Sequence, residues 1–255
     1  WGCIPTKALL KSAQVFEYLN HAEDYGLNAD NVSQDFKKII SRSRNVASGM
    51  SKGVTFLMKK NKIDVLKGFG KVKKDKIVSV DGNDYKAKHI IIATGAKSRI
   101  LPSIPQDGKQ IIGYREAMTL EKQPKSITIV GSGAIGIEFA YFYNSIGTEV
   151  TVIEYMPNIV PIEDLDISKE LEKSFKKKGI KIMTSSEVIS VEKTKNKVSA
   201  KVKKGDNEIN IESEILLSAV GIKSNIENIG LEDVGIAVDR DKILVDKFYN
   251  TNIPG

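Results

Sequence analysis

Hydrophobic residues recur at helical spacing over the first 60 positions and at strand spacing afterwards. Leu9, Leu10, Ala13, Phe16 and Leu19 share one face of a predicted first helix. A second predicted helix, with Asp30 or Ser33 as its N-cap, carries an apolar stripe made of Phe36, Ile39, Ile40, Val46, Met50, Val54 and Leu57. From residue 63 the pattern predicts strands at 63–66, 68–72, 77–80 and 85–90, with a turn at 81–83, and a buried strand over 90–95 that ends in a glycine.

The second half of the chain alternates between the two periods. An apolar run at 127–130 predicts a buried strand, a helix follows from Ala134 to about Gly147, and 149–154 predicts the next strand. A helix is expected over 164–178, and then strands near 180–184, 187–193, 197–204, 208–213 and 214–221. The sequence therefore predicts an α/β protein with a parallel sheet and an antiparallel β-meander, in three layers. The runs 90–95 and 214–221 share the strand-then-glycine ending, which suggests two Rossmann-like nucleotide-binding domains.

Glycines at 131, 133 and 136 stand between a predicted strand and a predicted helix. Gly131 permits a tight turn, Gly133 lets a pyrophosphate approach the backbone, and Gly136 lets the helix pack close to the strand. The free N–H groups at the start of the helix favour phosphate. This arrangement predicts a dinucleotide site.

Glu154 ends the next predicted strand, 18 residues after Gly136. A carboxylate there accepts hydrogen bonds from the adenosine ribose hydroxyls and repels a 2′-phosphate. Arg240 is the only arginine after Glu154, so the usual cation for NADP is missing. The sequence therefore favours NAD over NADP.

Composition and charge narrow the kinds of partner, compartment and metal site that we expect for this protein. The 255 residues carry a net charge of +7, spread over scattered lysines without interleaved aromatic residues, which argues against nucleic acid as a partner. No apolar run is long enough for a membrane span. The single cysteine suits a reducing, cytoplasmic compartment. No metal site is expected.

Cys3 is the one candidate redox residue. Pro5 favours the first turn of the opening helix, so Cys3 is expected at a helix N-terminus, where the backbone partial charge stabilises a thiolate. Lys7 is one helical turn away on the same face. On spacing alone, a buried or incidental cysteine beside a solvated lysine is the slightly better interpretation.

The segment Trp1–Leu10 (WGCIPTKALL) resembles the redox helix of the flavin-dependent pyridine nucleotide-disulfide oxidoreductases, most closely the dihydrolipoamide dehydrogenases. Further segments match in the order and spacing of that family: 68–72, 92–96, 131–138, 152–154, 220–225 and 251–255. The resemblance implies a partial FAD-binding domain with the redox helix at 1–110, an NAD-binding domain at 111–225 and a return segment at 226–255.

Site residues follow from the resemblance alone. Cys3 corresponds to the flavin-proximal cysteine of the redox pair, Lys7 to the lysine near the flavin N5, and Glu138 to its carboxylate partner. These three form the implied catalytic set. The FAD contacts are Lys7, Gly70, Thr94, Gly95 and Ala96. The implied NAD contacts are Gly131, Ser132, Gly133, Ala134, Ile135, Gly136, Ile137, Glu138, Glu154, Val188 and Gly221. For Thr94 and Val188, an ordinary loop or strand residue is almost as good an interpretation.

The implied reaction oxidises a dihydrolipoyl dithiol with NAD⁺ through an active-site disulfide and FAD. The implied partners are lipoyl domains of 2-oxoacid dehydrogenase or glycine-cleavage complexes, with a homodimer as the assembly. Against the family pattern, we expect the sequence to be truncated at both ends. The second cysteine, the first FAD glycine turn and the interface domain with its histidine and glutamate then lie outside it. His21 and His89 do not match that histidine. We expect such a chain to be inactive alone and to bind little FAD.

Several alternatives stay open at this point. Mercuric reductase shares the cysteine helix, and its additional cysteines lie in a C-terminal region that this sequence does not include. Glutathione-type reductases are disfavoured by Glu154, and a soluble transhydrogenase by the presence of Cys3. A non-enzymatic NAD-binding protein is the alternative from a different class.

Overall fold

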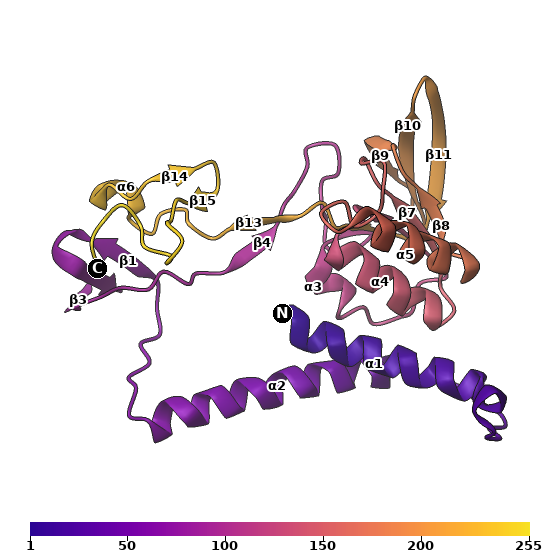
Figure 1. The fold of residues 1–255 in the computed structure, drawn as a ribbon, viewed down its shortest axis with the longest axis horizontal. Helices are drawn as coiled ribbons and strands as arrows, with labels where there is room; N and C mark the ends of the chain where they lie inside the picture. The colour runs from indigo at the N-terminus through magenta and orange to yellow at the C-terminus, as the bar shows by residue number, and fades with distance from the viewer. The chain divides into compact units, whose positions relative to one another are not determined.

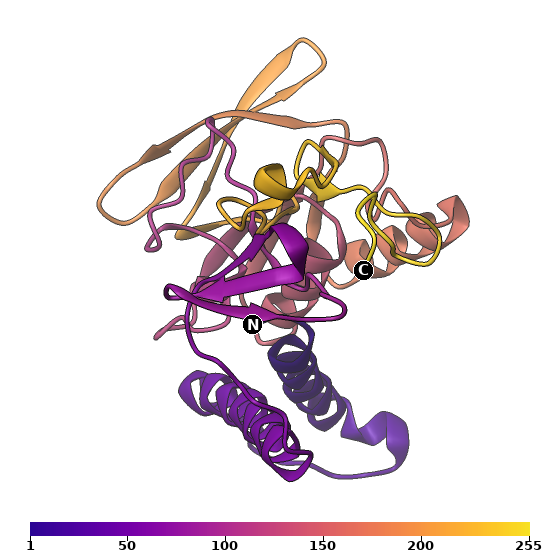
Figure 2. The ribbon, with the colours of Figure 1, turned by 90° about the vertical axis from the view of Figure 1, so that its left-hand side faces the viewer.

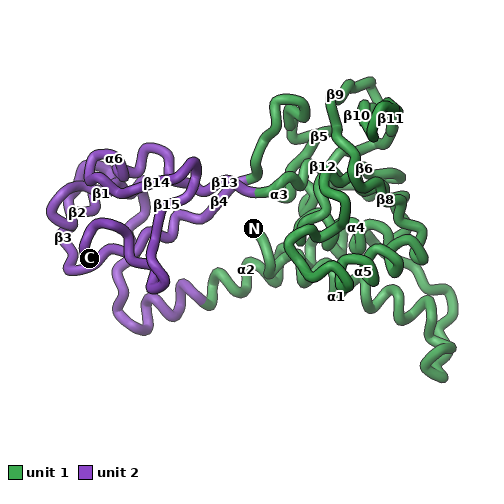
Figure 3. Tube along the Cα trace, turned by 45° about the horizontal axis from the view of Figure 1, so that its top comes forward, with its two compact units in different colours: residues 1–53, 98–221 green, residues 54–97, 222–255 purple.

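The computed structural model describes residues 1–255, which form two compact units (Figure 3). Unit 1 contains residues 1–53 and 98–221, and unit 2 contains residues 54–97 and 222–255. The helices are α1 (Cys3–Asn20), α2 (Phe36–Lys60), α3 (Tyr114–Ala117), α4 (Ala134–Ser145), α5 (Leu165–Lys177) and α6 (Leu231–Val234), with a 3₁₀ turn at Ala22–Tyr25 and another at Lys74–Lys76. No helix is long and apolar enough to cross a bilayer.

Unit 1 is built on a five-stranded parallel sheet in the order β5-β12-β6-β7-β8. Its strands are β5 (Ile111–Ile112), β6 (Ser126–Val130), β7 (Glu149–Ile153), β8 (Lys181–Met183) and β12 (Ile215–Ser218). Helix α4 connects β6 to β7, and α5 connects β7 to β8 (Figure 1). A crossover helix between neighbouring parallel strands is the expected connection, because parallel strands cannot be joined by a tight hairpin.

Each face of this sheet buries a separate apolar layer. Ile127 and Ile129 of β6 pack with α4, α1 and the start of α2, whereas Val130 faces the opposite layer. That opposite layer packs against the antiparallel meander of β9 (Glu187–Lys193), β10 (Val198–Lys204) and β11 (Asn207–Ser213). The meander is drawn in light orange at the top of Figure 2. Alternation along each strand thus sends successive side chains into two cores. The predicted α/β class, with a parallel sheet and a β-meander, is confirmed.

Unit 2 is smaller and mostly antiparallel. It contains β1 (Gly70–Lys73), β2 (Ile77–Val80) and β3 (Asn83–Lys86), the pair β4 (Ala96–Ser98) with β13 (Ile222–Ser224), and the pair β14 (Val238–Asp239) with β15 (Lys242–Ile243). β4 extends by one residue, Ser98, into unit 1. Asp81 and Gly82 both have positive φ, of 48° and 88°, and connect β2 to β3 through the predicted turn. Positive φ at both central residues is the geometry of a type I′ hairpin.

Two predicted strands are absent from the structure. Residues 63–66 have no regular structure, and the run 90–95 forms no strand, with Ile91 90% exposed. An apolar run becomes a buried parallel strand only where neighbours accept and donate its backbone hydrogen bonds. No strand of this chain lies beside 90–95 to do so.

Helix α2 differs from its prediction in two respects. Asp35 caps its start, because the side chain accepts the Lys38 backbone N–H at 3.1 Å, so neither Asp30 nor Ser33 is the cap. Phe36 and Ile40 of the predicted stripe are buried, but Met50 and the residues that follow are exposed. Helical spacing identifies an apolar face without specifying what covers it.

Candidate nucleotide and thiol site

The glycine turn lies at the carboxyl edge of β6, where α4 begins. Gly131 has a φ of 98°, and a Cβ there would come within 2.5 Å of the Ala219 carbonyl oxygen. A Cβ on Gly136 would collide with the carbonyl oxygen of Gly131. Both glycines are therefore required by the close approach of α4, β6 and the end of β12, as the sequence predicted.

Gly133 is required for a different reason. It is the N-cap of α4, no side chain caps that helix, and no protein atom lies within 4 Å of where its Cβ would be. The first backbone N–H groups of an uncapped helix lack partners inside the helix and favour an anion. The space beside Gly133 and these donors fit a pyrophosphate. Ala134, the first residue of α4, is exposed, whereas Ile137 is buried against the core.

Glu154 follows β7 directly, and its side chain is only 7% exposed. Its Oε2 accepts the Ser132 backbone N–H at 2.8 Å and the Ser132 hydroxyl at 2.7 Å. Its Oε1 accepts the Met156 backbone N–H at 2.7 Å. The structure thus places the acid that ends β7 against the glycine turn that ends β6, as the dinucleotide prediction requires.

Lys7 on α1 donates a hydrogen bond to Glu138 on α4. The predicted contact between these residues is confirmed, although they are 131 positions apart. Lys7 keeps 60% of its side-chain surface exposed and Glu138 keeps 28%, so the ammonium remains accessible. Further along α1, Leu9 and Ala13 are fully buried in the core that α1 shares with α4.

A second ion pair, which the sequence did not predict, lies at the other end of α1. Glu17 Oε2 accepts from Lys178 Nζ at 2.5 Å, just beyond the end of α5. Partial burial raises the pKa of Glu17, but the hydrogen bond and positive charge of Lys178 outweigh it, and the pKa is lowered overall. No local spacing could reveal this pair, because its members lie 161 positions apart.

Cys3 is the first residue of α1, and its free thiol is exposed. Gly2 is the N-cap and provides no side-chain cap, so the backbone donors of the first turn lie near the thiol. The predicted position of Cys3 at a helix N-terminus is confirmed. Both histidines are also exposed, and no group of three or more potential metal ligands comes together in the chain.

The residues assigned to FAD other than Lys7 lie in unit 2. Gly70 begins β1, and the turn Thr94–Ala96 leads into β4. Asn225 fixes this turn: its backbone N–H donates to the Gly95 carbonyl at 2.9 Å, and its side chain donates to the Thr94 carbonyl at 3.2 Å. Gly95 has a φ of 73°, a conformation that favours glycine.

Three further NAD candidates have separate positions in unit 1. Ile135 is half-buried in the first turn of α4 and packs against the main core. Val188 lies on β9, where it is buried in the cluster between the meander and the sheet. Gly221 follows β12 with a φ of 103°, and its carbonyl accepts the Arg99 backbone N–H at 3.0 Å.

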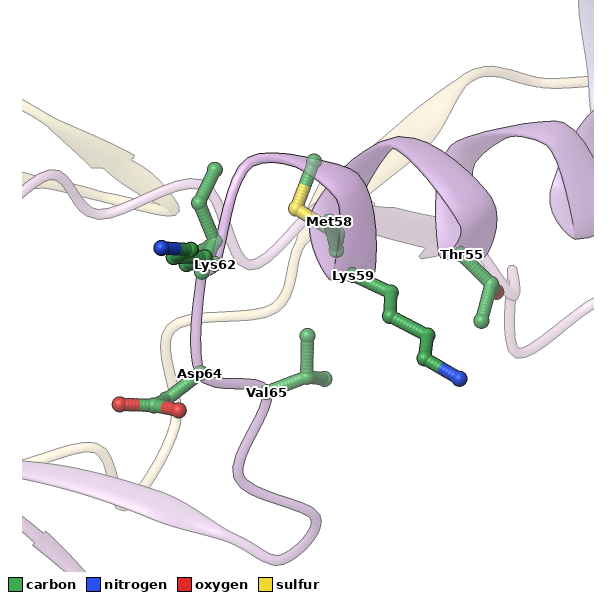
Figure 4. Close-up of a pocket in the computed structure, with 7 residues that line it drawn as sticks. Thr55, Met58, Lys59, Lys62, Asp64 and Val65 are labelled. Carbon is green, nitrogen blue, oxygen red and sulfur yellow. The ribbon is translucent and has the colours of Figure 1, made fainter.

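An open hollow lies elsewhere, at the end of α2 (Figure 4). Its lining includes Met58, Lys59, Lys62 and Val65. None of the predicted site residues contributes to it, and the side chains of Lys59, Lys62 and Asp64 extend in different directions around it (Figure 4). The nucleotide and thiol site is therefore defined by the sheet edge and α1, not by this hollow.

The chain is similar along its whole length to several curated dihydrolipoyl dehydrogenases. The chain is 45% identical over 277 residues to the dihydrolipoyl dehydrogenase of Rhizobium etli, an alignment that covers 100% of this chain and 57% of the relative. It is 40% identical over 265 residues to the dihydrolipoyl dehydrogenase of Bacillus subtilis, covering 98% of this chain and 56% of the relative. The chain thus spans little more than half the length of these relatives.

Solved structures and a family profile indicate the same family as these relatives. LpdA from Mycobacterium tuberculosis superposes with a TM-score of 0.88 at 27% identity, covering 98% of this chain and 56% of that one. The HOCl-induced flavoprotein disulfide reductase RclA from Escherichia coli gives 0.80 at 26% identity, with 98% and 54% covered. The profile described as pyridine nucleotide-disulphide oxidoreductase matches residues 1–255. With its glycine turn, its acid after β7 and its thiol-bearing helix, the chain belongs to the pyridine nucleotide-disulphide oxidoreductase family.

Proposed function

We propose that this chain provides the NAD-binding and thiol-bearing parts of a dihydrolipoyl dehydrogenase, which oxidises a dihydrolipoyl dithiol to the disulfide while NAD⁺ becomes NADH and a proton is released. One observation carries the proposal. The helix that bears the only thiol packs against the helix that follows the glycine turn, and Lys7 and Glu138 form an ion pair between the two helices. A thiol and a dinucleotide site are thereby combined in one packed unit.

The residues at the sheet edge have distinct roles in this proposal. Gly133 and the first N–H groups of α4 hold the pyrophosphate, and Glu154 accepts from the adenosine ribose. Glu154 also disfavours a 2′-phosphate, which supports NAD over NADP. Val188 flanks the adenine and Gly221 lies towards the nicotinamide, two roles that rest on the family resemblance alone.

On the thiol side, Cys3 is proposed as the flavin-proximal member of a redox pair. When bound, FAD supplies the hydride chemistry between thiols and nicotinamide. Lys7 presents an accessible ammonium whose position is fixed by Glu138, and an ammonium favours electron density at a ring nitrogen. Gly70 and the Thr94–Ala96 turn are proposed as further FAD contacts.

The proposed partners are lipoyl domains of 2-oxoacid dehydrogenase or glycine-cleavage complexes, with a homodimer as the assembly and the cytoplasm as the location. The proposed domains are the FAD part at 1–110, the NAD part at 111–225 and the return segment at 226–255. They divide the chain by nucleotide, whereas the two compact units divide it by packing. Both divisions place β6, α4 and β7 in a single body.

The test is dihydrolipoamide:NAD⁺ activity of the protein in its full natural length, with Cys3→Ser as the matched variant. We expect activity in the wild type and its loss in Cys3→Ser, with NADH binding retained, because the nucleotide residues are untouched. Activity that survives Cys3→Ser contradicts the thiol assignment. Reduction of Hg²⁺ with NADH in place of dihydrolipoamide oxidation indicates a mercuric reductase instead.

A further inference from the structure

Ser132 lies in the middle of the glycine turn, yet its side chain does not face the space beside Gly133. It is fully buried, and its hydroxyl donates to Glu154 Oε2 at 2.7 Å. Its backbone N–H donates to the same oxygen at 2.8 Å. A residue whose hydroxyl and amide both bind one buried carboxylate oxygen is placed to orient that carboxylate.

The backbone around Ser132 is itself fixed on both sides. Its carbonyl accepts the Val160 N–H at 3.0 Å, and the preceding Gly131 N–H donates to the Ile153 carbonyl at 2.8 Å. On the other partner, the Glu154 N–H donates to the Met183 carbonyl at 2.8 Å. These hydrogen bonds hold the backbones of Ser132 and Glu154 in place at the ends of β6 and β7.

The carboxylate of Glu154 keeps one acceptor position free of protein donors. An ionised carboxylate offers about four acceptor positions, two on each oxygen. Ser132 fills both positions on Oε2, and Met156 fills one on Oε1. One position on Oε1 remains, enough for a single ribose hydroxyl. Turning the carboxylate away would remove charge-assisted bonds from a buried anion, which is unfavourable.

We propose that Ser132 is a positioning residue that holds Glu154 in place and thereby sets the discrimination against 2′-phosphorylated nucleotides. A free 2′-hydroxyl can donate to the remaining position, whereas a 2′-phosphate meets a negative charge that cannot move aside. The inference rests on the proposed NAD site and adds to it the residue that makes Glu154 selective.

The test measures the dissociation constants of NADH and NADPH by calorimetric titration of the 255-residue chain. Ser132→Ala keeps the backbone N–H and removes only the hydroxyl bond. We expect the dissociation constant of NADPH divided by that of NADH to fall by about tenfold in this variant. That is the effect of losing one hydrogen bond to a charged group. Ser132→Cys, a weak donor of similar volume, must lower the ratio in the same direction.

Two controls separate positioning from general damage. Ser218→Ala makes the same change at a buried serine on β12 whose hydroxyl has no partner, and must leave the ratio unchanged. In a Glu154→Ala background, Ser132→Ala must have no further effect on the ratio, because its action passes through Glu154. Thermal melting checks that each variant is folded.

The outcomes distinguish the two proposals. A wild type that binds NADH tightly and NADPH weakly, with the ratio unchanged in folded Ser132→Ala and Ser132→Cys, overturns the role of Ser132 and leaves the NAD site standing. An equal effect of Ser132→Ala with and without Glu154 also overturns it. A wild type that binds neither nucleotide overturns the NAD site itself.

Discussion

The ammonium of Lys7 meets the carboxylate of Glu138 where α1 crosses α4. Lys178 and Glu17 repeat this arrangement at the other end of α1. Between the two ion pairs, the helix buries Leu9 and Ala13 against the sheet core. The thiol-bearing helix is therefore fixed by apolar burial and positioned by charge.

The stability of this packing should come from the apolar residues. Leu9→Ala removes a fully buried side chain and should lower the free energy of unfolding by about 2–5 kcal/mol. Lys7→Met removes a partly exposed ion pair and should change the free energy of unfolding by less than about 1 kcal/mol. Denaturant unfolding of the two variants measures both. Equal losses in the two variants contradict this division.

Gly136 and Gly133 should separate folding from ligand binding. Gly136→Ala forces its new methyl group against the Gly131 carbonyl, so we expect a lower melting temperature and loss of NADH binding. Gly133→Ala points its methyl group into open space, so the melting temperature should stay near that of the wild type while NADH binds at least tenfold more weakly. Unchanged NADH affinity in Gly133→Ala refutes the pyrophosphate position.

Asp107 should give the loop before β5 its sensitivity to acid. Burial raises the pKa of this carboxyl, but hydrogen bonds from Lys193 and from the backbone N–H groups of residues 109–111 outweigh it and hold the pKa well below 3.8. A depressed folded pKa contributes stability that is present above pH 3.8 and is lost as the pH falls towards the folded pKa.

Asp107→Asn should therefore be less stable than the wild type by a constant amount above about pH 5, where the carboxyl is ionised in both the folded and the unfolded chain. The difference should shrink below pH 3.8. Thermal melting of both proteins from pH 7 to pH 3 checks this. A gap that widens on acidification contradicts the sign of the pKa shift.

Periodicity and glycine spacing predicted most of unit 1. The strand, glycine turn, helix and acid from Ile127 to Glu154 form a local unit, and local units are set by neighbouring residues. The contact between Lys7 and Glu138 was predicted only through the family resemblance, because no spacing rule joins residues 131 positions apart.

The features that the sequence did not predict correctly have physical causes. Residues 90–95 are apolar enough for a buried strand, yet strand formation depends on a partner that the run itself does not encode. The capping role of Asp35 was missed because Asp30, Asn31 and Ser33, which are also of types that cap helices, precede α2 as well. The hydrogen bond from the Ser132 hydroxyl to Glu154 was not predicted, because no spacing rule joins residues 22 positions apart.

The central claim is that the turn at 131–136 and Glu154 together form an NAD site. Titration of the 255-residue chain with NADH and NADPH under identical conditions tests it most directly. We predict saturable NADH binding that is at least tenfold tighter than NADPH binding and is weakened by Gly133→Ala. NADPH binding as tight as or tighter than NADH, or no binding of either nucleotide, contradicts the claim.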